Sequence, residues 1–73
     1  MRTSTIRIAA QDLAKAGFNA NRPYEACDLI AIALDDKAAV KARVNADSMT
    51  LTVEVNTNQL LDAANTLREL GLI

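Results

Sequence analysis

The sequence predicts a small α+β domain in which a three-stranded antiparallel sheet carries helices on one face, in the order β-α-α-β-β-α. Two stretches that alternate apolar and polar residues flank a polar turn, and they indicate a hairpin of strands over residues 38–44 and 49–55. A third alternating stretch, residues 2–8, predicts the remaining strand. Segments 9–16 and 24–34 have the apolar content and the boundary residues of helices.

The predicted hairpin has one apolar face and one polar face. Its turn is expected at Asn45-Ala46-Asp47-Ser48, which places Val44 opposite Met49 and Ala42 opposite Leu51. In this register every apolar residue shares one face, and a one-residue slip would move them all to the other. The apolar set is Val40, Ala42, Val44, Met49, Leu51, Val53 and Val55.

The N-terminal segment admits two interpretations. Ile6 and Ile8 alternate with threonines and Arg7, which favours a strand over residues 2–8 followed by a helix to Ala16. A helix that starts at Ser4 is the alternative, and it would give the order α-α-β-β-α. In both cases Gly17 is expected to end the helix, because glycine adopts the left-handed conformation without strain.

The second helix is predicted over residues 24–34. Pro23 suits its first turn, since the proline nitrogen has no hydrogen to leave unpaired. The run 26–34 is apolar nearly all round, so we expect a central, buried helix. A buried strand over residues 28–34 stays open as an alternative, because Asp35 and Asp36 are unfavourable at a helix C-terminus.

A last helix is predicted to begin at Asn56 or Thr57. Asn56 with Gln59 three residues later has the pattern of a capping box. Gly71 is expected to close this helix and to return Leu72 against Leu67. Residues 1–73 are therefore expected to form a single globular domain, the size class of such short chains.

Composition excludes several classes of site. One cysteine cannot form an internal disulfide, and a chain without histidine and with one cysteine cannot build a structural zinc site. The formal charge of −1 gives no strong field for a nucleic acid, a membrane surface or an acidic substrate. No export signal or membrane span is apparent, so a cytoplasmic location is expected.

The chain is not expected to be an enzyme or to bind a cofactor. It has no histidine for general acid–base catalysis, and Asp35-Asp36 has the pattern of a solvated charged pair in a turn. Cys27 lies in an apolar run without a base beside it, which is typical of an inert core thiol. The two glycines, Gly17 and Gly71, make no phosphate-binding loop.

Two kinds of partner remain, and the first is a protein. The only two aromatic residues lie in one loop with an arginine and two amides, and such residues are enriched at interface centres. The competing interpretation is that Phe18 caps the core and the asparagines form the turn. The predicted partner-binding residues are Phe18, Asn19, Asn21, Arg22 and Tyr24, joined by Lys41 and Arg43 on the hairpin.

The second kind of partner is a nucleic acid. Lys41 and Arg43, with Arg7, could form a basic strip on the polar face of the sheet and contact phosphates. That face has no aromatic residue on which a base could stack, and Glu54 weakens its positive charge. A free sheet edge also predicts a possible homodimer through sheet extension.

In size and composition the chain resembles the short, alanine-rich, weakly acidic proteins that phages and mobile elements encode, many of which block host complexes such as CRISPR effectors. The resemblance rests on no motif and implies no residue roles. The leading hypothesis is therefore a non-enzymatic inhibitor or regulator that binds a protein or ribonucleoprotein complex and blocks it sterically. The alternative is nucleic-acid binding by the basic strip.

Overall fold

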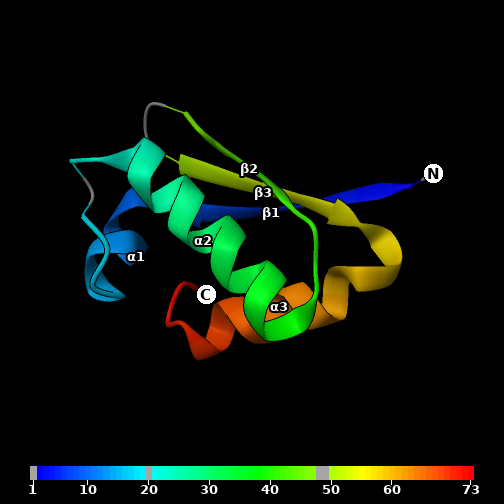
Figure 1. Ribbon diagram of the computed structural model, residues 1–73. Helices are drawn as coiled ribbons and strands as arrows, with labels where there is room; N and C mark the ends of the chain where they lie inside the picture. The colour runs from blue at the N-terminus through cyan, green and yellow to red at the C-terminus, as the bar shows by residue number, and fades with distance from the viewer. Residues whose placement is uncertain (1, 20, 48–49) are drawn as a thin grey trace.

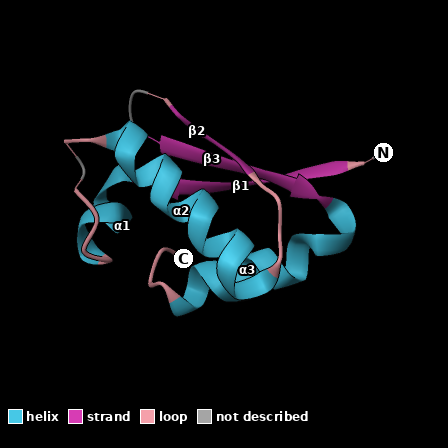
Figure 2. Ribbon diagram, in the orientation of Figure 1, coloured by secondary structure: helices cyan, strands magenta, loops and turns pink. Residues whose placement is uncertain are grey.

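The computed structural model of the protein describes residues 2–19, 21–47 and 50–73. Over these residues a three-stranded antiparallel sheet is covered on one face by helices (Figures 1 and 2). This confirms the predicted α+β class and its β-α-α-β-β-α order. The elements are β1 (Thr3–Ala9), α1 (Ala10–Lys15), α2 (Pro23–Ala38), β2 (Arg43–Ala46), β3 (Thr50–Asn56), the 3-10 turn η1 (Thr57–Gln59) and α3 (Leu60–Glu69).

The sheet has the order β1-β3-β2, so the last strand in the chain is the central one. Strand β1 pairs antiparallel with β3, and Ile6 and Ile8 lie opposite Val53 and Leu51. The strand interpretation of the N-terminal segment is thus confirmed over the helical alternative. Threonine and isoleucine suit this pairing because branched side chains pack well on a pleated surface.

The predicted register of the hairpin is wrong by four residues. Val44 pairs with Val53 and Ala46 with Leu51, because Asn45 and Ala46 belong to β2 and not to the turn. The turn follows Ala46, and the Asp47 N–H donates to the Thr50 carbonyl oxygen at 2.7 Å. Ser48 and Met49 lie outside the described residues. Because four is an even number, the described residues of the two strands keep their predicted faces.

Helix α2 is longer than predicted and includes Ala38, which was assigned to the first hairpin strand. It runs to Ala38 and excludes the buried-strand alternative for residues 28–34. Ala39 then adopts a left-handed conformation with φ of 53°, and the Val40 N–H donates to the Leu34 carbonyl oxygen at 3.1 Å. This bond satisfies a free carbonyl at the helix end and turns the chain toward the sheet. Strand β2 therefore begins at Arg43 and not at residue 38.

Glycines close the other two α-helices as predicted. Gly17 and Gly71 have φ of 90° and 82°. The following residue donates its N–H back to the helix in both cases, at 2.9 Å from Phe18 to Leu13 and 2.9 Å from Leu72 to Leu67. The predicted capping box is wrong, since the Asn56 side chain makes no capping hydrogen bond.

The core lies between the sheet and the helices. Its fully buried residues come from each of these layers and include Ile8, Leu34, Val53 and Leu67. Thr66, also buried, donates its hydroxyl to the Asp62 carbonyl oxygen at 3.0 Å, so this polar group does not lose a partner on burial. In the described part of the chain no helix combines the length and the apolar character that crossing a membrane requires.

Candidate interaction surfaces

Helix α2 has an exposed side that contains large apolar residues. Ala26, Cys27, Ile30 and Leu34 face the core, which confirms Cys27 as a core residue. Successive residues rotate by about 100° around a helix, so this core set leaves Leu29 and Ile32 on the solvent side. The prediction of a helix buried all round is therefore wrong, because Tyr24, Leu29 and Ile32 are 77%, 47% and 59% exposed.

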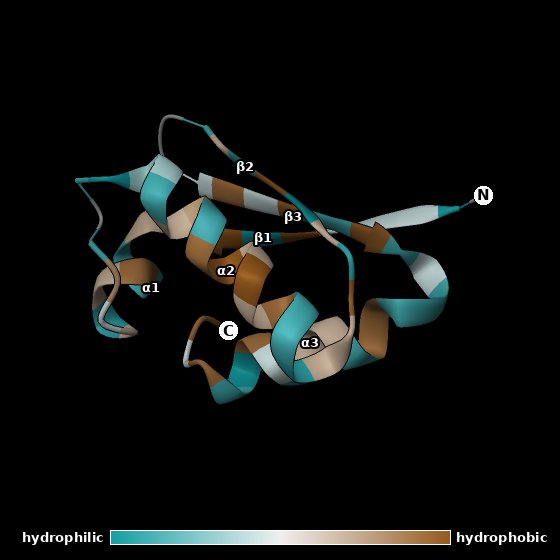
Figure 3. Cartoon of the chain, in the orientation of Figure 1, coloured by the Kyte–Doolittle hydropathy of each residue, from teal (hydrophilic) through white to brown (hydrophobic). Residues whose placement is uncertain are grey.

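Carboxylates surround these apolar residues. Glu25 and Asp28 lie in the first half of α2, and Asp35 and Asp36 lie in its last turns; all are exposed. The aspartates at 35 and 36 thus continue the helix and do not form the predicted turn. We define the α2 outer face as Tyr24, Glu25, Asp28, Leu29, Ile32, Asp35 and Asp36, along a helix of alternating hydropathy (Figure 3).

A groove of about 320 Å³ runs beside this face. Ala31, Ile32 and Asp35 form its helix wall, and Val40, Lys41 and Ala42 form the wall on the segment that leads into β2. Ile32 therefore contributes both to the exposed face and to a recess next to it. The groove has an apolar lining between one carboxylate and one ammonium group, which suits an apolar side chain from a partner.

In the loop before α2, the contacts agree with the interpretation that Phe18 caps the core and the asparagines form the turn. Phe18 is half-buried and packs against the core. The Asn19 side-chain oxygen accepts the Asn21 N–H at 2.9 Å, and the Asn19 carbonyl accepts the Arg22 N–H at 3.0 Å. These bonds shape the turn. Arg22 pairs with Glu25 at 3.6 Å, with both side chains largely exposed, so the pair contributes little to stability.

The polar side of the sheet forms a second surface. Cross-strand rows place Thr5, Glu54 and Arg43 side by side, and Arg7, Thr52 and Asn45 in the next row. We define the outer sheet face as the residues on this side of the strands together with Lys41, which precedes β2. They are Thr3, Thr5, Arg7, Ala9, Lys41, Arg43, Asn45, Thr50, Thr52, Glu54 and Asn56.

The cations of this face are not neutralised by contact. Arg43 lies opposite Glu54 on β3, yet the only ion pair within 4.0 Å among residues 2–19, 21–47 and 50–73 is the one between Arg22 and Glu25. Lys41 and Arg43 are both exposed. Their charges are therefore available to a ligand, with Glu54 as the local opposing charge.

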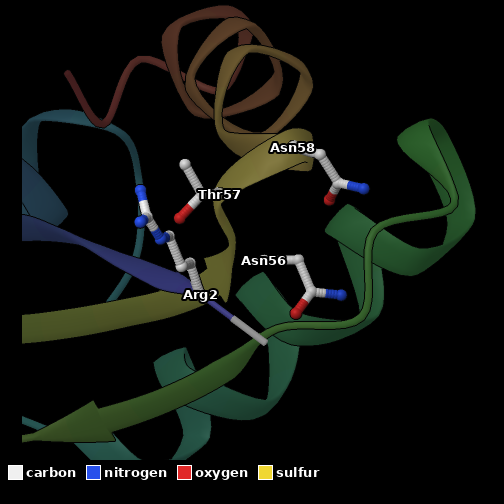
Figure 4. A pocket seen from close by; sticks show the side chains of 4 residues that line it. All are labelled: Arg2, Asn56, Thr57 and Asn58. Carbon is white, nitrogen blue, oxygen red and sulfur yellow. The ribbon is translucent and has the colours of Figure 1, made fainter.

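Two grooves meet at one end of this face. One, of about 410 Å³, is lined by Arg2, Asn56, Thr57 and Asn58, with Arg2 beside Thr57 (Figure 4). The other, of about 300 Å³, is lined by Thr3, Lys41, Arg43, Glu54, Val55 and Asn56. Asn56 belongs to both. The Thr57 N–H donates to the Arg2 carbonyl at 3.1 Å, and the hydroxyls of Ser4 and Thr57 lie 3.0 Å apart, which fixes the start of β1 against η1.

The seven residues predicted from the sequence therefore lie in two places. Phe18, Asn19, Asn21, Arg22 and Tyr24 precede or begin α2, whereas Lys41 and Arg43 follow its end. Helix α2, whose 16 residues are about 24 Å long, separates the two groups. Leu29, Ile32, Arg2 and Asn56 were not predicted. A helical projection of residues 23–38 could have revealed the first two, because only one side of a helix can face the core.

The acidic side chains and the thiol of the described residues lie apart from one another or are buried. No three of their cysteine and acidic side chains converge where a metal ion could be held. Cys27 is buried, and this burial is the main reason that the pKa of its thiol is raised above the ordinary value of 9.0. The negative charge of Asp28 raises the pKa further, and a backbone hydrogen bond of Cys27 lowers it by a smaller amount. A thiol with a raised pKa is protonated at neutral pH and is a weak nucleophile.

The two surfaces differ in chemistry: the α2 outer face is acidic and apolar, and the outer sheet face is polar with cations at one end. Function must therefore be inferred from these surfaces and their grooves. Comparison of the chain with known protein families, with curated proteins and with solved structures finds no match in any of the three.

Proposed function

We propose that this chain is a non-enzymatic protein-binding module that acts sterically through the α2 outer face. The observation that supports this proposal is the exposure of Tyr24, Leu29 and Ile32 on one helix. Fully burying an exposed aliphatic side chain of this size contributes about 1.5–3 kcal/mol, and Leu29 and Ile32, which are about half exposed, can contribute about half of that each on binding. A tyrosine at the N-terminal end of the same face adds a residue type enriched at interface centres.

The partner expected for this face is a basic protein surface with an apolar recess. Four carboxylates border Leu29 and Ile32, and the one arginine next to them, Arg22, already pairs with Glu25. Complementary charge speeds association and excludes wrong partners, while the apolar contacts supply most of the affinity. The groove beside Ile32 offers a place for a side chain of the partner.

This proposal keeps the predicted role of a small inhibitor or regulator of a larger assembly and extends the contact surface. Tyr24 remains part of it, with Arg22 at its edge, and Leu29 and Ile32 are added from the next turns of α2. Phe18 acts by holding the loop on the core. A cytoplasmic location belongs to the same proposal, since a lone, buried thiol suits a reducing compartment.

The test compares proteins captured from nuclease-treated host lysate by the wild-type chain and by two variants. Leu29→Ser/Ile32→Ser removes the central apolar contacts. Leu61→Ser is the matched control, because Leu61 is 73% exposed but lies on α3. We expect one set of proteins to be retained by wild type and control and lost from the double variant. Equal capture by all three chains, measured by quantitative mass spectrometry, would contradict the proposal.

Self-association through the sheet edge is a second candidate, favoured by the length of β1. This edge strand has seven residues, contains no proline and carries one charged side chain, Arg7. Natural edge strands are usually shortened, charged or covered to prevent such pairing. A dimeric mass is expected by light scattering at high micromolar concentration, and a monomeric mass there would exclude the dimer.

A further inference from the structure

We propose that the end of the outer sheet face where the two grooves meet binds the sugar-phosphate backbone of a single-stranded nucleic acid. Lys41 and Arg43 provide the main cationic contacts, Asn56 shares their groove, and Arg2 lines the adjoining groove. Lys41 also lines the groove beside Ile32, whereas Arg43, Asn56 and Arg2 line only the grooves at the end of the sheet. The inference therefore goes beyond the protein-binding function of the α2 outer face and does not depend on it.

The charges of this end favour an anion. Lys41 and Arg43 line one groove, Arg2 lines the adjoining one, and none of the three makes an ion pair with another described residue. Among the described residues that line these two grooves, Glu54 is the only carboxylate. Asp47 lies at the opposite end of β2, next to the turn. A phosphate at the cationic end therefore meets more positive than negative charge.

The spacing of the cations suits a repeating anion. Lys41 and Arg43 are two residues apart with Ala42 facing the other way, as the alternation of exposed and half-buried positions shows. Alternate residues of an extended chain are about 6.6 Å apart, which is comparable with the separation of neighbouring phosphates in an extended single strand. Each cation can thus contact a different phosphate of the same strand.

The neutral groups at this end are hydrogen-bond donors suited to phosphate and sugar oxygens. The Thr3 hydroxyl and the Asn56 amide line the groove that holds Lys41 and Arg43. The Asn58 amide lies in the adjoining groove (Figure 4). Such side chains, with arginine and lysine, make most contacts to nucleic-acid backbones and position the strand without selecting its sequence.

The size and composition of the face favour a single strand over a duplex or an acidic protein. Three strands span two interstrand distances, about 9.5 Å, which accommodates one backbone. A protein partner needs a large apolar or aromatic anchor, and the outer sheet face has none. The same lack of aromatics means that bases do not stack here, so binding is weak and independent of sequence.

The experiment measures fluorescence anisotropy of labelled oligothymidylate and oligouridylate with the full chain at increasing salt. Each neutralised phosphate contributes about 0.7 to the log–log slope for a single strand, so contacts by three cations give a slope of about −2. Lys41→Glu and Arg43→Glu are each expected to weaken binding about tenfold or more at low salt. Glu54→Gln, which removes the opposing charge, is expected to strengthen it.

Lys15→Glu and Arg68→Glu are the controls, because they make the same charge changes at exposed positions of α1 and α3. Their affinity is expected to stay within about twofold of wild type, since salt screens distant charges. No oligonucleotide binding at low salt, equal losses in the controls, or weaker binding by Glu54→Gln would overturn the proposal. So would binding of polyglutamate that depends on Lys41 without any binding of oligonucleotide.

Discussion

The α2 outer face and the outer sheet face lie in one small chain but expose different kinds of side chain. The first places Leu29 and Ile32, partly free of the core, among carboxylates. The second places hydroxyls, amides and unpaired cations on a sheet whose large apolar residues all point inward. An apolar helix can pack one side against the core and still expose apolar residues on the other side. A strand with strict alternation instead assigns its apolar residues to one side and its polar residues to the other.

The largest effect is expected from comparing the two sides of α2. Leu34 is fully buried, so Leu34→Ala should lower the free energy of unfolding by about 2–5 kcal/mol. Ile32→Ala, on the exposed side of the same helix, should change it by about 1 kcal/mol or less. Urea unfolding followed by circular dichroism measures both. Equal losses would show that Ile32 belongs to the core and is not available to a partner.

A smaller effect on stability is expected at Ala39, which follows α2 and begins the segment that leads to β2. Ala39 has a positive φ of 53°, which strains any residue with a Cβ atom. Ala39→Gly should therefore stabilise the protein by up to about 1 kcal/mol, although the greater freedom of glycine in the unfolded chain offsets part of this gain.

Gly71→Ala is the converse test at the end of α3. A Cβ atom there would lie 3.8 Å from the Ala16 side chain, an ordinary contact, so the cost arises from the φ of 82° alone. A loss of about 1 kcal/mol is expected. Thermal unfolding of both variants should show shifts of opposite sign, and shifts of the same sign would contradict this explanation of the helix ends.

The next expected effect is the dependence of stability on alkaline pH. The thiol pKa of Cys27 is raised in the folded state by burial and by Asp28. Its contribution is therefore complete below the ordinary pKa of 9.0 and is lost as the pH rises toward the folded value, because only the unfolded state then releases the proton. Cys27→Ala should show a smaller loss of stability over this range than wild type does.

The smallest expected effect is the reactivity of that thiol at neutral pH. Cys27 should react slowly with an aromatic disulfide reagent in the folded protein and rapidly in urea, because burial restricts access and keeps the thiol protonated. Absorbance of the released thiolate measures both rates. Fast reaction in the folded state would place Cys27 on the exposed side of α2 and reverse the assignment of its two faces.

Alternation and helix-ending glycines made most of the fold predictable. Strand faces followed from period-two patterns, and Gly17 and Gly71 correctly ended their helices. The end of α2 was not predictable because Ala39, and not a glycine, adopts the left-handed conformation there. The turn was misplaced because asparagine and alanine at 45 and 46 are compatible with both strand and turn, and the pairing that decides comes from Val53 and Leu51 on β3.

The candidate surfaces were only partly predictable for a related reason. Composition drew attention to the loop with two aromatics, but Phe18 is used by the core. The apolar run of α2 gave no sign of how many of its residues the sheet could cover. Arg2 and Asn56 join the cationic end through the pairing of β1 with the end of β3, a contact between residues far apart in the chain that local patterns do not encode.

The hairpin connection has a consequence for tolerance to changes in chain length. The register that pairs Val44 with Val53 and Ala46 with Leu51 is held by the buried side of the strands, so residues added between Ala46 and Thr50 lengthen the connection and leave the pairing unchanged. Longer surface connections also cost little conformational entropy. The hairpin connection is thus a natural place to insert a short epitope or a fluorophore-binding tag without disturbing either surface.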